Sequence, residues 1–81
     1  MRTKVVNIDE IYVPADRRKE LDPQKIEEAA EKIMEEAEMR PIQVRRGNDR
    51  FVLIKGINRL EAHKALGNKT VDVAIVSARL H

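Results

Sequence analysis

An apolar run at residues 51–54, Phe-Val-Leu-Ile, constrains the fold more than any other stretch of this chain. A half-exposed strand alternates apolar and polar residues, whereas this run is apolar on both faces. It therefore predicts a central strand that is covered on both sides. Gly56 follows closely, and a helical pattern then runs from about Ile57 to Leu66, where Gly67-Asn68 stops it. The stretch predicts a strand, a tight corner and a helix.

The first twenty residues predict two short extended segments. Apolar residues within 5–8 suggest a first strand, and residues 11–13 form a second extended piece that Pro14 stops. The charged sequence ADRRKE, residues 15–20, indicates a loop.

A first helix is predicted to begin at Asp22-Pro23, because aspartate is a good N-cap and proline is tolerated at the first helical position. Apolar residues then recur at helical spacing, at Ile26, Ala29, Ala30, Ile33 and Ala37. This helix should bury one stripe and expose its carboxylates to water.

Residues 41–45 and 50–54 flank Gly47-Asn48-Asp49, a pattern typical of a β-hairpin. Apolar residues alternate once more at 71–75 and predict a last strand. The order is strand, helix, hairpin, helix, strand. We therefore expect an α+β fold, a small mixed β-sheet with two main helices packed on it, as one domain spanning residues 1–81.

Composition excludes several classes of protein. Tyr12 and Phe51 are the only aromatic residues, so the core must be aliphatic. The absence of cysteine excludes disulfides, thiolate metal sites and cysteine nucleophiles. No apolar run is long enough to span a membrane, and no signal-peptide core is visible, so a cytoplasmic protein is expected. A chain of this length gains stability by dimerising, which favours a homodimer.

The charges are unevenly distributed. Residues 22–38 carry seven acidic side chains against Lys25 and Lys32, and residues 40–69 carry eight basic ones against Asp49 and Glu61. The basic portion can attract phosphates although the formal net charge is only +2.

The corner at Gly56 has two interpretations. A helix N-terminus attracts anions, glycine lets a ligand approach the backbone, and the guanidinium of Arg59 can grip a phosphate, with Lys55 beside it. Alternatively, Gly56 serves the turn alone and Arg59 forms an ion pair with Glu20 or Glu61.

The sequence GINRLEAHKALG at residues 56–67, preceded by PIQVRRGNDRFVLIK and followed by KTVDVAIV, resembles the ParB N-terminal-like domain. This family, which includes ParB-like nuclease domains, belongs to the ParB/sulfiredoxin superfamily. The matching features are Pro41-Ile42-Gln43-Val44, Gly56, Arg59, Ala62, Ala65-Leu66-Gly67 and the final strand at residues 71–76.

The resemblance implies nucleotide binding. In ParB proteins this box holds the phosphates of a nucleoside triphosphate, usually CTP, so Gly56 and Arg59 would contact phosphates. The ParB box reads G-E-R-R, whereas Ile57 and Asn58 occupy its middle positions here, and one family arginine is absent. Arg17 and Arg18 would close over the nucleotide, as the corresponding loop does in relatives, unless that loop is simply solvated. The implied ligand is CTP or ATP with Mg²⁺.

Two activities of the superfamily are not expected. The sulfiredoxin box reads G-C-H-R, and the replacement of its cysteine by Ile57 excludes sulfinic-acid reduction. The downstream ParB box and the helix-turn-helix have no counterpart before His81, so a complete CTP-gated DNA clamp is not expected.

Other relatives are described as nucleases, ATPases or kinases, and Glu20 is the candidate general base if its loop folds over the glycine box. No spacing of acids marks a metal cluster, and no metal site is expected. His63 shares the face of Arg59, but a lone histidine there is usually a surface residue, and His81 is too near the chain end to partner it. Asn58 with Glu61 fits a capping box.

Arg45, Arg46 and Arg50 gather at the hairpin. They either protect an edge strand from pairing with other sheets or contact DNA or RNA phosphates.

Three hypotheses follow from these observations. The first is a non-catalytic accessory domain in a DNA-related process, such as plasmid partition, that binds a nucleotide or phosphate at Gly56, Ile57, Asn58 and Arg59 with help from Arg17, Arg18 and Lys55. The second is a nuclease or NTPase. The third is a dimeric, DNA-associated interaction module.

Overall fold

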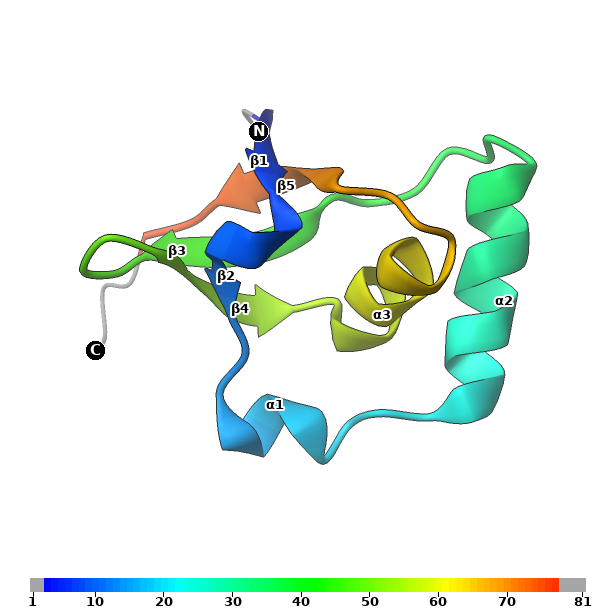
Figure 1. The fold of residues 1–81 in the computed structure, drawn as a ribbon, viewed down its shortest axis with the longest axis horizontal. Helices are drawn as coiled ribbons and strands as arrows, with labels where there is room; N and C mark the ends of the chain where they lie inside the picture. The colour runs from blue at the N-terminus through cyan, green and yellow to red at the C-terminus, as the bar shows by residue number, and fades with distance from the viewer. Residues whose placement is uncertain (1–2, 78–81) are drawn as a thin grey trace.

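Strand β4 (Phe51–Lys55) lies inside a five-stranded sheet in the computed structural model, which describes residues 3–77 (Figure 1). The sheet order is β1-β5-β3-β4-β2. The other strands are β1 (Thr3–Asn7), β2 (Ile11–Tyr12), β3 (Ile42–Arg46) and β5 (Thr70–Ile75). This described part also contains a 3-10 turn, η1 (Ile8–Glu10), and the helices α1 (Ala15–Arg18), α2 (Pro23–Met34) and α3 (Ile57–Ala65).

The sheet is mixed, as predicted. Strand β1 runs antiparallel to β5 and β3 antiparallel to β4, whereas the pairs β3–β5 and β2–β4 are parallel. Phe51, Val52 and Leu53 are 9%, 6% and 1% exposed, which confirms that β4 is a covered central strand. The α+β class with two main helices is likewise confirmed.

The core lies between the sheet and α3 and is aliphatic apart from Phe51. Val44, Val73 and Leu60 are fully buried, and α3 contributes Ile57 and Ala62 as well. Helix α2 packs against α3 instead of the sheet (Figure 1), and none of its residues is fully buried. The expectation that both helices pack on the sheet was therefore wrong for α2.

Two of the expected local structures were also wrong. Residues 15–18 form a helical turn instead of a loop, because the amides of Arg17 and Arg18 bond to the Pro14 carbonyl, and alanine and arginine favour helix. Ile8 begins η1 and so lies outside the first strand. The amide of Ile8 bonds to the carbonyl of Lys69 at 2.9 Å, which holds this turn beside the start of β5.

Helix α2 begins as predicted, with the Asp22 carboxylate accepting a hydrogen bond from the Gln24 amide at 3.0 Å. It ends earlier than predicted. The amide of Ala37 bonds to the Lys32 carbonyl and that of Glu36 to the Ile33 carbonyl, a Schellman motif with Glu36 in the left-handed region at φ 56°. Ala37 therefore lies beyond the helix.

Helix α3 ends in the same motif, but glycine occupies the left-handed position. The amide of Gly67 (φ 81°) bonds to the Lys64 carbonyl and that of Asn68 to the His63 carbonyl.

No helix within residues 3–77 is long and apolar enough to cross a membrane.

Candidate functional site

Gly56 joins β4 to α3 in a conformation that requires glycine. Its φ is +107°, in the left-handed region, and a Cβ there would lie 3.2 Å from Cγ1 and 3.5 Å from Cα of Ile42. The turn alone is thus a sufficient reason for glycine at this position. As the N-cap, Gly56 offers no side chain to bond the first amides of α3.

Arg59 lies in the first turn of α3 and is half-buried. Neither of the expected ion pairs forms: Glu20 pairs with Arg17 (Oε2 to Nη1, 3.1 Å), and Glu61 pairs with Lys64 (Oε2 to Nζ, 3.2 Å). Within residues 3–77 the Arg59 side chain makes no hydrogen bond and no ion pair. Burial lowers the pKa of its guanidinium. An uncompensated, partly desolvated cation of this kind is suited to receive an anion.

Two hollows meet at Arg59. The first, which we name the corner cleft, has a volume of about 240 Å³ and is lined by Glu20, Lys25, Glu28, Ala29, Lys32, Met39, Gly56, Ile57, Asn58 and Arg59. The second, the His63 cavity, has a volume of about 250 Å³ and is lined by Ile33, Ala37, Met39, Arg40, Pro41, Ile42, Arg59, His63 and Asp72. Arg59 and Met39 line both hollows.

The corner cleft contains two lysines that sequence reasoning missed. Lys25 and Lys32 were treated as part of an acidic, solvated helix, yet both line the cleft. Their spacing of seven residues, two helical turns, places them on one face of α2 and was the available signal. Together with Arg59 they give the cleft three positively charged side chains, and Glu20 and Glu28 give it two negatively charged ones.

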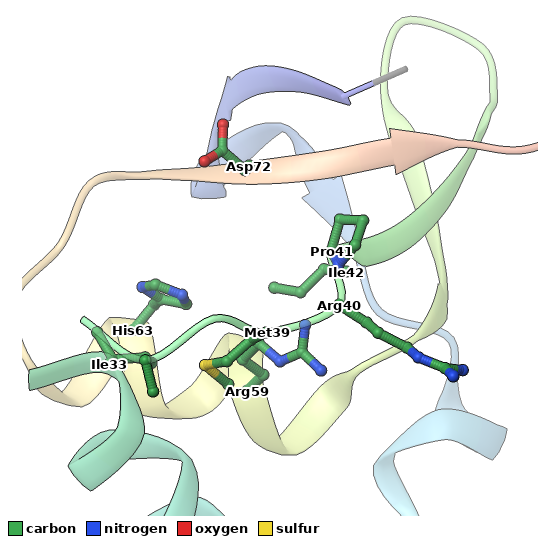
Figure 2. A pocket seen from close by; sticks show the side chains of 9 residues that line it. Ile33, Met39, Arg40, Pro41, Ile42, Arg59, His63 and Asp72 are labelled. Carbon is green, nitrogen blue, oxygen red and sulfur yellow. The ribbon is translucent and has the colours of Figure 1, made fainter. Parts of the chain in front are cut away.

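The His63 cavity is the more apolar of the two hollows. In the view of Figure 2, Arg59 and His63 rise from the same helix, while the Arg40 side chain points away from them. Nδ1 of His63 lies 3.0 Å from Nδ2 of Asn68. Burial lowers the pKa of His63, the charge of Arg59 lowers it further, and Asp72 partly opposes this shift. His81, the other histidine, lies outside the described residues.

Asn58 does not cap α3, so the capping-box interpretation was wrong. Gly56 is the N-cap, and the Asn58 side chain instead reaches the segment before α2. Its Oδ1 accepts a hydrogen bond from the Asp22 amide at 2.8 Å, and its Nδ2 donates one to the Glu20 carbonyl at 3.2 Å. Asn58 therefore ties the start of α2 to the start of α3.

The fold places some of the remaining residues expected at the corner in the cleft and others outside it. Glu20 does line the corner cleft, although its carboxylate is paired with Arg17. Arg18 lines a different hollow, together with Val13, Leu21, Ile57, Glu61 and Lys64. Lys55 is exposed at the end of β4 and is not among the residues that line the cleft.

The hairpin arginines lie at the other end of β4. Strand β5 pairs with β3 only at residues 42–44, and β2 pairs with β4 only at residues 51–52. Arg45 and Arg46 lie beyond the last β3–β5 pair, so the sheet order does not decide between edge protection and phosphate binding. Arg45, Arg46 and Arg50 line a hollow of about 450 Å³ with Gly47, Asn48 and Val52.

No group of three or more histidine, aspartate or glutamate side chains in the described chain could hold a metal ion.

Comparison with known proteins places this geometry in a family. The model of the ParB N-terminal domain matches residues 2–80. A protein of Campylobacter jejuni named probable chromosome-partitioning protein ParB is 38% identical over 71 residues, which cover 86% of this chain and 26% of that protein. The chain thus spans about a quarter of the length of this relative.

Solved structures share the fold. Sulfiredoxin from Arabidopsis thaliana superposes with a TM-score of 0.82 at 24% identity, over 96% of this chain and 88% of that one. C-terminally truncated ParB from Caulobacter crescentus, complexed with CTP-γ-S, gives a TM-score of 0.78 at 20% identity, over 98% of this chain and 46% of that one.

Proposed function

The chain belongs to the ParB N-terminal domain family, and from this premise we propose that its corner cleft binds the phosphates of a nucleoside triphosphate without hydrolysing it. One observation carries the proposal: the half-buried guanidinium of Arg59 has no ion pair or hydrogen bond within residues 3–77. Desolvating a cation without a partner is costly, and a phosphate would provide the missing charge-assisted hydrogen bonds.

The surroundings of Arg59 support the same ligand. The first amides of α3 point out of the helix N-terminus, and no side chain caps them. Lys25 and Lys32 add two positive charges on the opposite wall of the cleft. A triphosphate has enough charged oxygens to pair with all three cations. A single inorganic phosphate has fewer charged oxygens and would pair with fewer of them.

The carboxylates of Glu20 and Glu28 fit a magnesium complex of the nucleotide. Mg²⁺ is usually held by one or two carboxylates together with the phosphates of its substrate. The Caulobacter ParB of the same fold is complexed with CTP-γ-S, so CTP is the first nucleotide to test and ATP the second.

The proposed role is that of an accessory domain in a DNA-related process in the cytoplasm. The Campylobacter relative is named a chromosome-partitioning protein, which favours DNA segregation as the setting. We propose that residues 1–81 act as one domain and that the chain forms a homodimer. Sedimentation equilibrium, with and without nucleotide, tests the dimer.

The position of Glu20 favours a second candidate, nucleotide hydrolysis. Its side chain lines the same cleft as Asn58 and Arg59, a position from which a general base could activate a water molecule near the bound phosphates. Release of inorganic phosphate that needs Mg²⁺ and disappears in Glu20→Gln would establish hydrolysis. Saturable nucleotide binding without release of phosphate would instead support the non-catalytic binding role.

Calorimetric titration with CTP, ATP and GTP in the presence of Mg²⁺ tests the proposal. We expect saturable heat with at least one nucleotide and its loss in Arg59→Ala. Arg18→Ala is the matched control, because it removes an arginine that lines a different hollow, and it should bind as the parent chain does. Equal losses in the two variants, or no heat with any nucleotide, would refute the site.

A further inference from the structure

The hairpin between β3 and β4 carries a second set of cations without acidic partners. Arg45, Arg46 and Arg50 make no ion pair with any residue in the described range 3–77. We infer that this hairpin binds the phosphate backbone of duplex DNA, independently of base sequence and of the nucleotide in the corner cleft.

Two of these arginines lie over aromatic rings. The guanidinium carbon of Arg50 lies 3.9 Å from the centroid of the Tyr12 ring, and that of Arg46 lies 5.6 Å from the centroid of the Phe51 ring. A cation over a ring face is attracted by the ring quadrupole. This attraction uses none of the N–H donors of the guanidinium if its plane lies along the ring. Neither the Arg46 nor the Arg50 side chain donates a hydrogen bond to a residue within 3–77, so their donors are available to phosphate oxygens.

The charge around the hairpin is favourable on one side. The hollow lined by Arg45, Arg46 and Arg50 has a volume of about 450 Å³ and no carboxylate in its lining. A neighbouring hollow, which Arg46 and Arg50 also line, contains Asp49 and Glu10 together with Lys4. The face without carboxylates is thus the one that a polyanion would approach.

The hairpin site is separate from the corner cleft. Arg50 precedes β4 and Gly56 follows it, so the two sites lie at opposite ends of one strand (Figure 1). A strand of this length spans roughly 16 Å. A nucleotide whose phosphates occupy the corner therefore leaves the hairpin free for a different ligand.

Duplex DNA fits this surface better than a single strand does. Proteins that bind single strands commonly stack bases on exposed aromatic rings. Here Tyr12 and Phe51 are the only aromatic residues, and each has a guanidinium over its ring. The contacts that remain are charge-assisted bonds to phosphates, which are densest along a duplex.

Fluorescence anisotropy with a short labelled duplex of unrelated sequence, over a series of salt concentrations, tests this inference. The variant Arg45→Gln/Arg46→Gln/Arg50→Gln should weaken binding about tenfold and reduce the slope of log K against log salt by about 2 to 3. Lys19→Gln/Lys64→Gln/Lys69→Gln is the matched control, because it removes the same charge away from both sites, and its slope should match that of the parent chain.

Additional variants keep the test decisive. If the triple hairpin variant does not fold, Arg50→Gln alone should reduce the slope by about 1. Tyr12→Leu keeps every cation but removes the ring beneath Arg50, and it should weaken binding about two- to threefold. Equal losses in the control and hairpin variants, or tighter binding of a single strand of the same length, would overturn the inference. Nucleotide titration of the hairpin variant should be unchanged, which separates this result from that for Arg59.

Discussion

Helices α2 and α3 lie against each other but are held in different ways. Helix α3 is enclosed between the sheet and α2, buries Ile57, Leu60 and Ala62, and has a glycine in the left-handed conformation at each end. Helix α2 packs mainly against α3 and has no fully buried residue. It is followed by Glu36 in a left-handed conformation that glycine would adopt more easily.

The difference indicates separate roles for the two helices. Helix α3 provides the corner, and its residues Ile57 and Leu60, next to Gly56 and Arg59, are buried in the core. The outer helix α2 provides the lysines of the opposite wall and is attached mainly through a half-buried stripe and Asn58. The corner cleft therefore has one strongly held wall and one weakly held wall. Elements with few buried contacts are those that open first.

Truncation of one apolar side chain on each helix should produce the largest contrast. Leu60→Ala removes a fully buried side chain and should lower the free energy of unfolding by about 3 kcal/mol. Ile33→Ala truncates a half-buried side chain on α2 and should cost about 1 kcal/mol. Urea denaturation measures both. Equal costs would show that α2 is packed as tightly as α3.

Removal of the Asn58 side chain should weaken the attachment of α2. Asn58→Ala loses both hydrogen bonds to the segment before α2 and should cost about 1 to 2 kcal/mol. Asn48→Ala at the hairpin, where the side chain makes no hydrogen bond to a described residue, should cost less than about 0.5 kcal/mol.

Hydrogen exchange at Asp22 gives a local measure of the same attachment. The Asp22 amide should exchange faster in Asn58→Ala, because it loses its acceptor. Asn58→Asp should fall between the parent chain and the alanine variant, since a carboxylate still accepts from this amide but cannot donate to Glu20. Unchanged exchange in both variants would contradict the role given to Asn58.

The two Schellman motifs should respond to substitution in opposite directions. Glu36→Gly relieves a left-handed non-glycine residue and should stabilise the chain by about 0.5 to 1 kcal/mol. Gly67→Ala places a side chain at φ 81° and should cost about 1 kcal/mol, from backbone strain alone, since no atom lies within 4 Å of its new Cβ. Thermal denaturation of both variants checks the signs, and two changes of the same sign would refute this explanation.

The pH dependence of His63 should give the smallest effect. Its pKa is lowered from 6.5 by burial and by Arg59, so the unfolded chain binds a proton more readily than the folded one. Stability from this residue is fully present above pH 6.5 and is lost as the pH falls through the lower folded pKa. His63→Gln should remove this slope in urea denaturation below pH 6.5. Parallel pH profiles for the parent and the variant would rule the effect out.

Local patterns predicted much of the fold. Asp22-Pro23, the Gly47-Asn48-Asp49 turn and the stretch from Phe51 to Gly67 each contain their own start or stop signals, and the elements formed where these signals lie. The errors have local causes as well. The charged residues 15–20 were predicted as a loop, but residues 15–18 form a helical turn. The apolar stripe continues to Ala37, which predicted a longer helix than the one that ends at Met34.

The candidate site was predicted less completely than the fold. The sequence alone determined the corner at Gly56, the position of Arg59 in the first helical turn and the membership of the family, because these depend on neighbouring residues or on an ordered motif. The tertiary structure alone decided that Lys25 and Lys32 face this corner, that Arg18 does not, and that Asn58 binds the segment before α2. The physical reason is that the helical period specifies one face of α2 but not the element against which that face packs. The packing of α2 on α3 brings together residues more than thirty positions apart, such as Asp22 and Asn58, and no local pattern contains that contact.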